Sequence, residues 1–225
     1  IVPDQLWNAK QFFQAKQVEQ QQRHLRFHDT GYRLEPNVKE SPGGLRDIQT
    51  IAWVAKRHFG AQTLQELVTH GFLSEQEYQE LHEGQLYLWR VRFALHRLYG
   101  RHEDRLLFDH QLKLANFFGY TDKKGSLAVE QFMQQYYRCI KRLTALNDVL
   151  LQLFDQAILH PVASEATVLS KHFVVRDHFI EATSDILFEQ TPWSMMEMFY
   201  LMQRHPSIVG IQAQTLRQLR RARYV

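Results

Sequence analysis

The chain has 225 residues, 44% of them hydrophobic and 23% charged, a composition that predicts a folded core and excludes a disordered chain. Lysine and arginine number 27 against 24 aspartate and glutamate residues, and the net charge of +3 does not by itself indicate nucleic-acid binding. No apolar run is long enough to cross a membrane, no signal peptide is recognisable, and the single cysteine, Cys139, excludes an internal disulfide. We therefore expect a cytoplasmic protein that contacts neither membrane nor nucleic acid.

Helix-breaking residues are scarce, since the chain holds ten glycines and six prolines. Together with the many Leu, Gln, Glu, Arg and Ala residues, this predicts long helices. The expected fold class is all-α, a multi-helix bundle of about seven or eight helices with one small β-hairpin near the C-terminal part. The missing initial Met and the abrupt basic end lead us to expect a piece of a longer protein.

The first two predicted helices are separated by a loop. A helix is predicted over residues 3–28, where Gln and Lys separate a few apolar residues and leave most of the helix solvated. A turn at residues 29–31 ends this helix, because its glycine favours a left-handed cap. Residues 32–42 are expected to be extended, since each of their two prolines disfavours helix at the preceding residue. The second helix begins after Gly43 and Gly44 and has one apolar face.

Three helices are predicted in the middle of the chain. A short one covers residues 64–69. Ser74 and Glu77 have the spacing of a capping box and begin a long amphipathic helix that runs to Gly100. Asp109 is expected to cap the third of these helices. The side chains predicted to face inward from it are Leu112, Ala115 and Phe118.

The longest helix is predicted over residues 126–159 and is ended by Pro161. Its apolar face is typical of packing along a bundle, and Cys139 on that face is expected to be an inert buried thiol. We predict a helical bundle over residues 1–160 and a small hairpin-plus-helix segment over residues 161–225.

The hairpin is predicted from two short apolar stretches, residues 173–175 and 179–180, which flank Arg176 and Asp177. A further helix is expected to begin at Pro192, and a last one covers residues 212–223.

The densest group of candidate functional residues lies in residues 35–48. Gly43 and Gly44 at a helix start would leave backbone N–H groups open, where the helix dipole favours an anion. Lys39 and Arg46 would bind a phosphate from two sides. The simpler alternative is a glycine-rich helix cap with Arg46 and Asp47 in surface ion pairs.

The same residues carry a family resemblance. Residues 37–49 (Asn-Val-Lys-Glu-Ser-Pro-Gly-Gly-Leu-Arg-Asp-Ile-Gln) resemble the signature of the bacterial PII uridylyltransferase/uridylyl-removing enzyme family. The other stretches similar to that family are residues 88–96, 100–108, 114–120 and 215–223. A looser version of the signature belongs to glutamine synthetase adenylyltransferase. The ending Asp47-Ile-Gln and the block at residues 103–106 favour the uridylyltransferase.

The resemblance implies a helical region between two catalytic domains that this chain lacks, a nucleotidyltransferase domain and an HD phosphohydrolase domain. The C-terminal ACT domains of the family are missing too. In that family UTP reacts with a tyrosine of the PII signalling protein, with Mg²⁺ as cofactor, and the metal ligands would lie outside this chain. The chain is therefore expected to be catalytically incomplete alone, with no catalytic or metal-binding residue of its own.

The resemblance also assigns roles to six residues of the loop. Lys39 and Arg46 are implied to contact the triphosphate or PII. Asn37 and Asp47 would orient them, and Gly43 and Gly44 would permit close approach. A different class of function stays open, namely a helical interaction module that docks a partner protein without touching nucleotide.

Three weaker candidates compete with simpler interpretations. His24 and His28 share a helical face beside Asp29, but no third metal ligand is placed by spacing, and the HD dipeptide at 28–29 lacks the context of an HD domain. Arg90, Arg97 and Arg101 form a basic stripe that would contact nucleotide or an acidic partner, or would form surface ion pairs. The expected ion-pair partners are Glu103, Asp104 and Asp109. The basic residues 217–223 lack an aromatic platform for nucleic acid and are interpreted as a linker helix.

Overall fold

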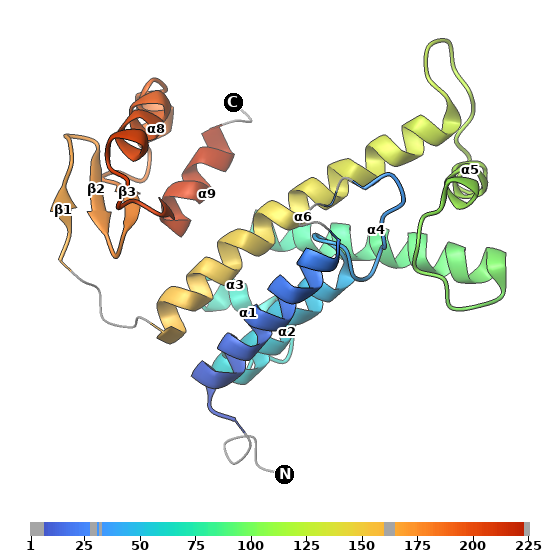
Figure 1. The fold of residues 1–225 in the computed structure, drawn as a ribbon, viewed down its shortest axis with the longest axis horizontal. Helices are drawn as coiled ribbons and strands as arrows, with labels where there is room; N and C mark the ends of the chain where they lie inside the picture. The colour runs from blue at the N-terminus through green and yellow to red at the C-terminus, as the bar shows by residue number, and fades with distance from the viewer. Residues whose placement is uncertain (1–6, 28–30, 32, 160–164, 223–225) are drawn as a thin grey trace. The chain divides into compact units, whose positions relative to one another are not determined.

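The computed structural model describes residues 7–27, 31, 33–159 and 165–222 (Figure 1). Within these residues there are nine helices and four short strands. The chain divides into two compact units, Ile1–Asp148 and Val149–Val225. The predicted mostly helical class is confirmed, but the helix count is slightly higher than predicted and the hairpin is part of a larger sheet.

The first unit is built from helices. They are α1 (Ala9–Arg26), α2 (Leu45–Phe59), α3 (Glu66–Thr69), α4 (Glu75–Tyr99), α5 (Phe108–Phe117) and α6 (Ala128–Leu159), the last of which continues into the second unit. Helix α1 begins at Asn8, whose side chain accepts a hydrogen bond from the Gln11 N–H, and it packs along α2 (Figure 1). The predicted start near residue 3 and the turn at 29–30 lie outside the described residues.

The core of the first unit forms where α4 and α6 approach closely. Leu88 and Leu95 of α4 and Tyr136 of α6 are fully buried, and each such side chain contributes about 1.5–3 kcal/mol by leaving water. Gly84 permits the approach, because a Cβ there would lie 2.7 Å from Leu143 Cδ2. Cys139 is also buried, as predicted.

The helix boundaries show where the local sequence was sufficient to predict a helix start and where it was not. The capping box is confirmed: Ser74 Oγ accepts from the Glu77 N–H at 3.2 Å, and Glu77 Oε2 accepts from the Ser74 N–H at 2.8 Å. The Asp109 cap is wrong, because the N-cap of α5 is Leu107 and the helix begins two residues earlier than predicted, at Phe108. The Phe108 N–H donates to Glu35 Oε1 at 3.0 Å, so a residue far away in the sequence closes this helix end.

The packed face of α5 also differs from the prediction. Ala115 is buried as predicted, but Leu112 is 52% exposed and its neighbour Leu114 is buried instead.

The second unit combines a small sheet with three helices and the last part of α6. Its strands are β1 (Thr167–Val168), β2 (Phe173–Arg176), β3 (Phe179–Ala182) and β4 (Gly210–Ile211), and its further helices are α7 (Leu187–Gln190), α8 (Ser194–Arg204) and α9 (Ala213–Ala222). The strand order is β1-β2-β3-β4, with β3 and β4 parallel and the other pairs antiparallel.

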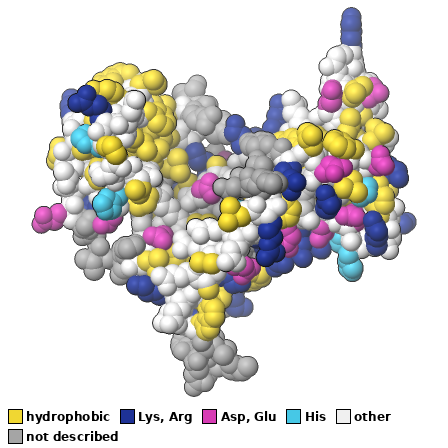
Figure 2. All heavy atoms as spheres, in the orientation of Figure 1, with side chains coloured by type: hydrophobic (Ala, Val, Ile, Leu, Met, Phe, Trp, Pro, Cys, Tyr) yellow, Lys and Arg dark blue, Asp and Glu magenta, His cyan; other side chains and the backbone are white. Residues whose placement is uncertain are grey.

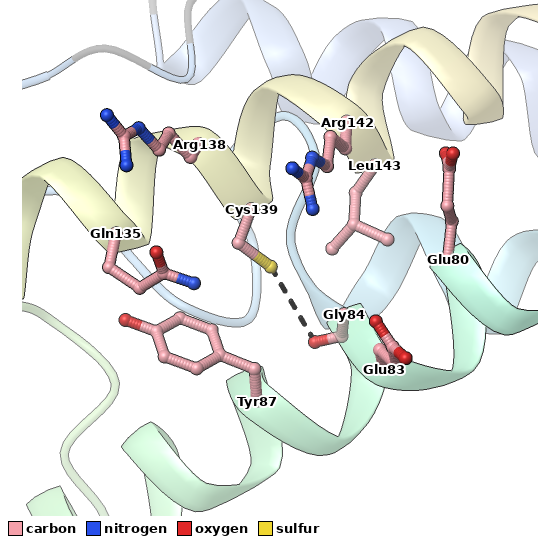
Figure 3. A pocket seen from close by; sticks show the side chains of 9 residues that line it. All are labelled: Glu80, Glu83, Gly84, Tyr87, Gln135, Arg138, Cys139, Arg142 and Leu143. Carbon is pink, nitrogen blue, oxygen red and sulfur yellow. Dashed lines mark hydrogen bonds between the residues drawn. The ribbon is translucent and has the colours of Figure 1, made fainter.

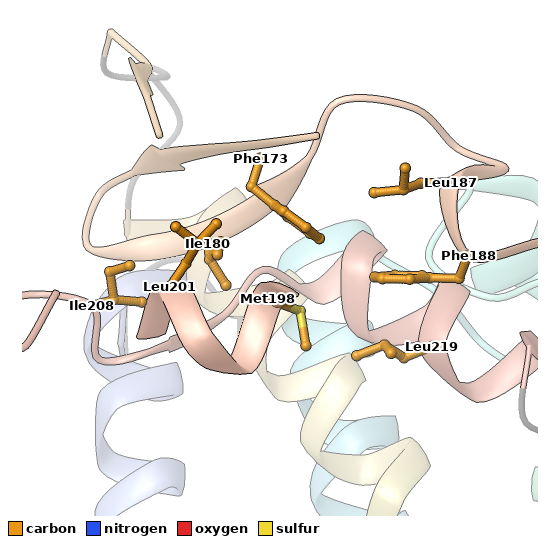
Figure 4. Packing of buried hydrophobic residues seen from close by; sticks show 8 residues of the cluster. All are labelled: Phe173, Ile180, Leu187, Phe188, Met198, Leu201, Ile208 and Leu219. Carbon is orange, nitrogen blue, oxygen red and sulfur yellow. The ribbon is translucent and has the colours of Figure 1, made fainter. Parts of the chain in front are cut away.

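The predicted hairpin is β2–β3. Its turn lies at Asp177 and His178, which have φ values of 50° and 68°, so both adopt the left-handed conformation of a two-residue hairpin turn. This places the turn one residue later than predicted. The sheet packs on α7, α8 and α9, and the buried cluster drawn in Figure 4 consists of Phe173, Ile180, Leu187, Phe188, Met198, Leu201, Ile208 and Leu219.

No described helix combines the length and apolar character needed to span a bilayer.

Candidate functional site

The loop before α2 is held in one shape by its own hydrogen bonds. Asn37 Oδ1 accepts from the N–H groups of Lys39 and Glu40 at 3.0 and 2.8 Å, which forms an Asx-type turn. The Asn37 N–H donates to Ser41 Oγ at 2.9 Å. Asn37 therefore shapes the backbone that carries Lys39, and its expected role of orienting the Lys39 and Arg46 side chains stays a prediction.

The backbone N–H groups at the start of α2 are used within the loop. Gly43 N donates to Asp47 Oδ2 at 2.7 Å, and Gly44 N donates to the Ser41 carbonyl at 2.8 Å. The next two amides, of Leu45 and Arg46, donate to carbonyls of the same loop. The prediction of open amides at the glycine pair is therefore wrong, because each of these donors already has a partner.

Both glycines are buried, and their small size serves packing. Gly43 has φ 76°, and a Cβ there would lie 2.5 Å from Thr144 Oγ1 on α6. A Cβ on Gly44 would lie 2.8 Å from the carbonyl oxygens of Lys39 and Ser41. The close approach that these residues permit is an approach of the chain to itself. Contact of either glycine with a ligand stays a prediction.

Asp47 lies at the centre of a buried polar cluster that joins α1 to α2. Only 1% of the residue is exposed. Its Oδ1 accepts from Gln20 Nε2 and Arg23 Nη2, both at 2.8 Å, and lies 3.0 Å from His24 Nε2. The surface ion pair considered for Asp47 is wrong, because burial excludes it. These contacts join Asp47 to α1 and to Gly43, so its expected role of orienting Lys39 and Arg46 stays a prediction.

Sequence reasoning missed Gln20 and Arg23, which supply two of these contacts. No local pattern marks them, because they lie 27 and 24 residues before Asp47. His24, weighed as a metal ligand, contacts Asp47 instead, whereas His28 and Asp29 lie outside the described residues.

The two predicted cations do come together, on one carboxylate. Glu40 Oε1 lies 3.5 Å from Lys39 Nζ and 3.3 Å from Arg46 Nη2. Glu40 Oε2 lies 3.8 Å from Arg23 Nε, which makes Arg23 a third cation at this point. The side chains of Lys39, Arg46 and Glu40 are each 25–31% exposed, so this group meets solvent.

An aromatic ring supports the same surface. The Arg46 guanidinium lies 5.5 Å and Lys16 Nζ lies 4.7 Å from the centre of the Trp53 ring. Arg46 is thus held between a carboxylate and an aromatic face.

A separate pocket of about 150 Å³ lies between α4 and α6 (Figure 3). It is lined by Glu80, Glu83, Gly84, Tyr87, Gln135, Arg138, Cys139, Arg142 and Leu143. The Cys139 thiol donates to the Gly84 carbonyl oxygen at 3.8 Å, and burial raises the pKa of Cys139 to about 12. The thiol is therefore protonated at neutral pH and unsuited to nucleophilic chemistry.

Two arginines in residues 90–101, Arg92 and Arg101, form ion pairs within the chain. Arg92 Nε donates to Asp104 Oδ1 at 2.7 Å, and Arg101 Nη2 donates to Glu103 Oε2 at 3.1 Å. Burial alone would raise the pKa of Asp104, but hydrogen bonds from Arg92 and His96 lower it below its ordinary value. The predicted use of Glu103 and Asp104 as ion-pair partners is therefore confirmed.

The fold and the site define the class of protein region: it is mostly helical and gathers three cations at a helix start. This arrangement suits a phosphate or another anion. The sequence model described as GlnD PII-uridylyltransferase matches residues 11–151, and the one described as Uridylyltransferase GlnD third domain matches residues 173–225. The chain belongs to this uridylyltransferase family, as residues 37–49 predicted.

Relatives named bifunctional uridylyltransferase/uridylyl-removing enzyme align along nearly the whole chain. The protein of Pseudomonas aeruginosa (strain UCBPP-PA14) is 51% identical over 98% of this chain, and that of Nitrosococcus oceani is 48% identical over 100% of it. The chain spans about a quarter of the length of these relatives, since it covers 25% of each. No solved structure is significantly similar.

Proposed function

We propose that this chain is the helical region beside the nucleotidyltransferase site of a PII uridylyltransferase/uridylyl-removing enzyme. In this proposal the whole enzyme transfers UMP from UTP to a tyrosine of PII in the cytoplasm, and the chain alone is catalytically incomplete. The names of the relatives support the two activities, and their fourfold greater length leaves room for the nucleotidyltransferase, HD and ACT domains.

The observation that carries the proposal is the convergence of Lys39 and Arg46 on one partly exposed carboxylate, that of Glu40. A triphosphate carries several negative charges, and a phosphoryl-transfer site works largely by positioning and neutralising them. Lys39 supplies a point charge, whereas Arg46 supplies a planar pair of donors already oriented by Trp53. These two side chains would contact the triphosphate or an acidic part of PII.

The residues of this loop do not fit a magnesium site. Mg²⁺ requires several oxygen ligands, and Glu40 is surrounded by cations that would repel the metal. Within the described ranges there is also no group of three His, Cys, Asp or Glu side chains placed to hold a metal ion. In this proposal the Mg²⁺ of the reaction is held by other domains of the whole enzyme.

The test uses the full-length enzyme with Lys39→Ala and Arg46→Ala, singly and combined. Loss of a charged hydrogen bond costs about 1.5–3 kcal/mol, so each variant should lower kcat/KM for UTP-dependent PII labelling roughly 10- to 100-fold. Arg101→Ala is the matched control, because Arg101 is 68% exposed and pairs with Glu103. Unchanged kinetics in both variants would exclude the proposal.

A docking module that does not touch nucleotide is the second candidate. It is supported by apolar side chains at α8: Met196, Phe199 and Tyr200 on the helix and Trp193 at its N-cap are each more than half exposed. Figure 2 shows hydrophobic side chains gathered on the second unit. In the full-length enzyme Met196→Glu should weaken PII binding, measured without UTP, if this candidate holds, whereas Lys39→Ala should then leave UTP kinetics unchanged.

A further inference from the structure

Glu40 is outnumbered by the cations around it. Three basic side chains have a nitrogen within 4 Å of its carboxylate, those of Arg23, Lys39 and Arg46. Arg23 also pairs with Asp47, so two carboxylates face three permanent charges. All three distances to Glu40 exceed those of a charge-assisted hydrogen bond, about 2.7–2.9 Å, which indicates that Glu40 satisfies none of its partners fully.

Arg23 provides independent evidence that the site is incomplete. Its side chain is 7% exposed, and Nη2 is fixed by Asp47 at 2.8 Å. Nε is buried and has no hydrogen-bond partner within the described residues, although it lies 3.8 Å from Glu40 Oε2. A buried donor without an acceptor costs about 1–3 kcal/mol, and an additional oxygen placed near Nε would recover that loss.

We propose that Glu40 occupies the place of an anion in the unliganded chain, and that a polyphosphate displaces it and binds to Arg23, Lys39 and Arg46. A terminal phosphate has three oxygens and more charge than a carboxylate, so it can supply an acceptor to each cation. Arg23 is held in place beforehand by Asp47, which reduces the entropy cost of binding.

Glu40 can leave without disturbing the loop. Its side chain is 30% exposed and so has a route to water. Its backbone remains anchored, because its N–H donates to Asn37 Oδ1 and its carbonyl oxygen accepts from Arg23 Nη1 at 3.4 Å. The exchange requires only rotation of one side chain, and Glu40 then acts as a selectivity element: an incoming anion must carry enough charge to replace it.

The experiment titrates the 225-residue chain with inorganic triphosphate by calorimetry at low ionic strength. Glu40→Gln keeps the size of the side chain but removes the competing charge, and should tighten binding about tenfold, which corresponds to about 1.4 kcal/mol. Glu35→Gln is the matched control, since Glu35 is in the same loop, is equally exposed at 31% and lies 3.9 Å from Arg105. This control should bind as the unaltered chain does.

Two further arms make the result decisive. The double variant Glu40→Gln/Arg46→Ala should not show the tenfold tighter triphosphate binding, because that increase in affinity depends on the cations that Glu40 leaves free. Repeating the titration with UTP tests whether the site recognises the phosphates or the nucleoside. If it recognises the phosphates, Glu40→Gln should tighten UTP binding by the same factor as triphosphate binding. Equal or weaker triphosphate binding by Glu40→Gln, or no binding by either protein, overturns the inference. If only PII binds more tightly to Glu40→Gln, the site takes an acidic protein surface and the inference is likewise overturned.

This inference rests on the proposed function only in naming a polyphosphate as the anion. If Glu40→Gln tightens triphosphate binding but Lys39→Ala and Arg46→Ala both leave uridylylation unchanged in the full-length enzyme, the proposed function fails and the anion site stands. If Lys39→Ala slows uridylylation and Glu40→Gln leaves triphosphate binding unchanged, the proposed function stands and the inference about Glu40 fails.

Discussion

Asp47 and Glu40 are two carboxylates of the same helix entry, and both face Arg23, yet their surroundings differ. Asp47 is 1% exposed and has short contacts with four donors, whereas Glu40 is about one-third exposed and has longer contacts with three cations. A fully bonded, buried carboxylate stabilises the fold, whereas a loosely held one at the surface can be exchanged. A structural carboxylate and an exchangeable one are therefore distinguished here by their burial and by their distances to the cations, since both are acidic side chains of nearly the same type.

The largest expected effect is on stability, from Asp47→Ala. Removing the carboxylate leaves the Arg23 guanidinium buried without its partner, and breaking a buried pair costs about 3–5 kcal/mol. Chemical denaturation of the 225-residue chain measures this loss. Glu19→Ala, which removes the more exposed Lys16–Glu19 pair, should cost less than about 1 kcal/mol. Equal losses in the two variants would contradict the contrast drawn between buried and exposed carboxylates.

A smaller effect is expected when the glycine beside Asp47 is changed. Gly43→Ala combines a left-handed backbone with a Cβ 2.9 Å from the Ile140 carbonyl oxygen, and overpacking of this kind adds about 1–3 kcal/mol. Gly60→Ala is the matched control, because Gly60 has a similar φ of 71° and no atom within 4 Å of its added Cβ. It should cost only the left-handed strain, about 1–2 kcal/mol. Comparison of the two melting temperatures isolates the packing cost.

The smallest effect concerns Asp104, a partly exposed carboxylate whose pKa is lowered in the folded chain by Arg92 and His96 against the opposing effect of burial. A lowered folded pKa stabilises the fold above the unfolded pKa, near 3.9, and this contribution disappears as the pH falls through the folded pKa. Between pH 5 and pH 2 the unaltered chain should therefore lose more stability than Asp104→Asn, by at most about 1 kcal/mol. Urea denaturation at each pH measures the free energy of unfolding. If this free energy falls equally with pH in the two proteins, Asp104 makes no pH-dependent contribution to stability.

Features encoded by neighbouring residues were predictable from the sequence. The capping box of Ser74 and Glu77 needs only a spacing of three, and the β2–β3 hairpin follows from two apolar stretches around a turn. The extent of α6 follows from its periodic apolar face. The family followed from one contiguous motif, residues 37–49, which the comparison with known proteins confirmed.

Features encoded by distant residues were not predictable in this way. The start of α5 depends on Glu35, which lies 73 residues from its partner Phe108. The partners of Asp47 come from another helix, and the internal use of the Gly43 and Gly44 amides depends on how the loop folds back. Strands β1 and β4 have two residues each, too few to show a period.

The loop of Lys39 is also tied to the chain that joins α4 to α5. The Val38 N–H donates to the Asp104 carbonyl and the Leu106 N–H donates to the Pro36 carbonyl, both at 2.8 Å. Arg46 is carried by α2 instead. A shift of the α4–α5 connection would therefore be passed to the loop that carries Lys39 and Glu40, and from there to the first turn of α2, because the Arg46 N–H donates to the Lys39 carbonyl oxygen at 2.9 Å.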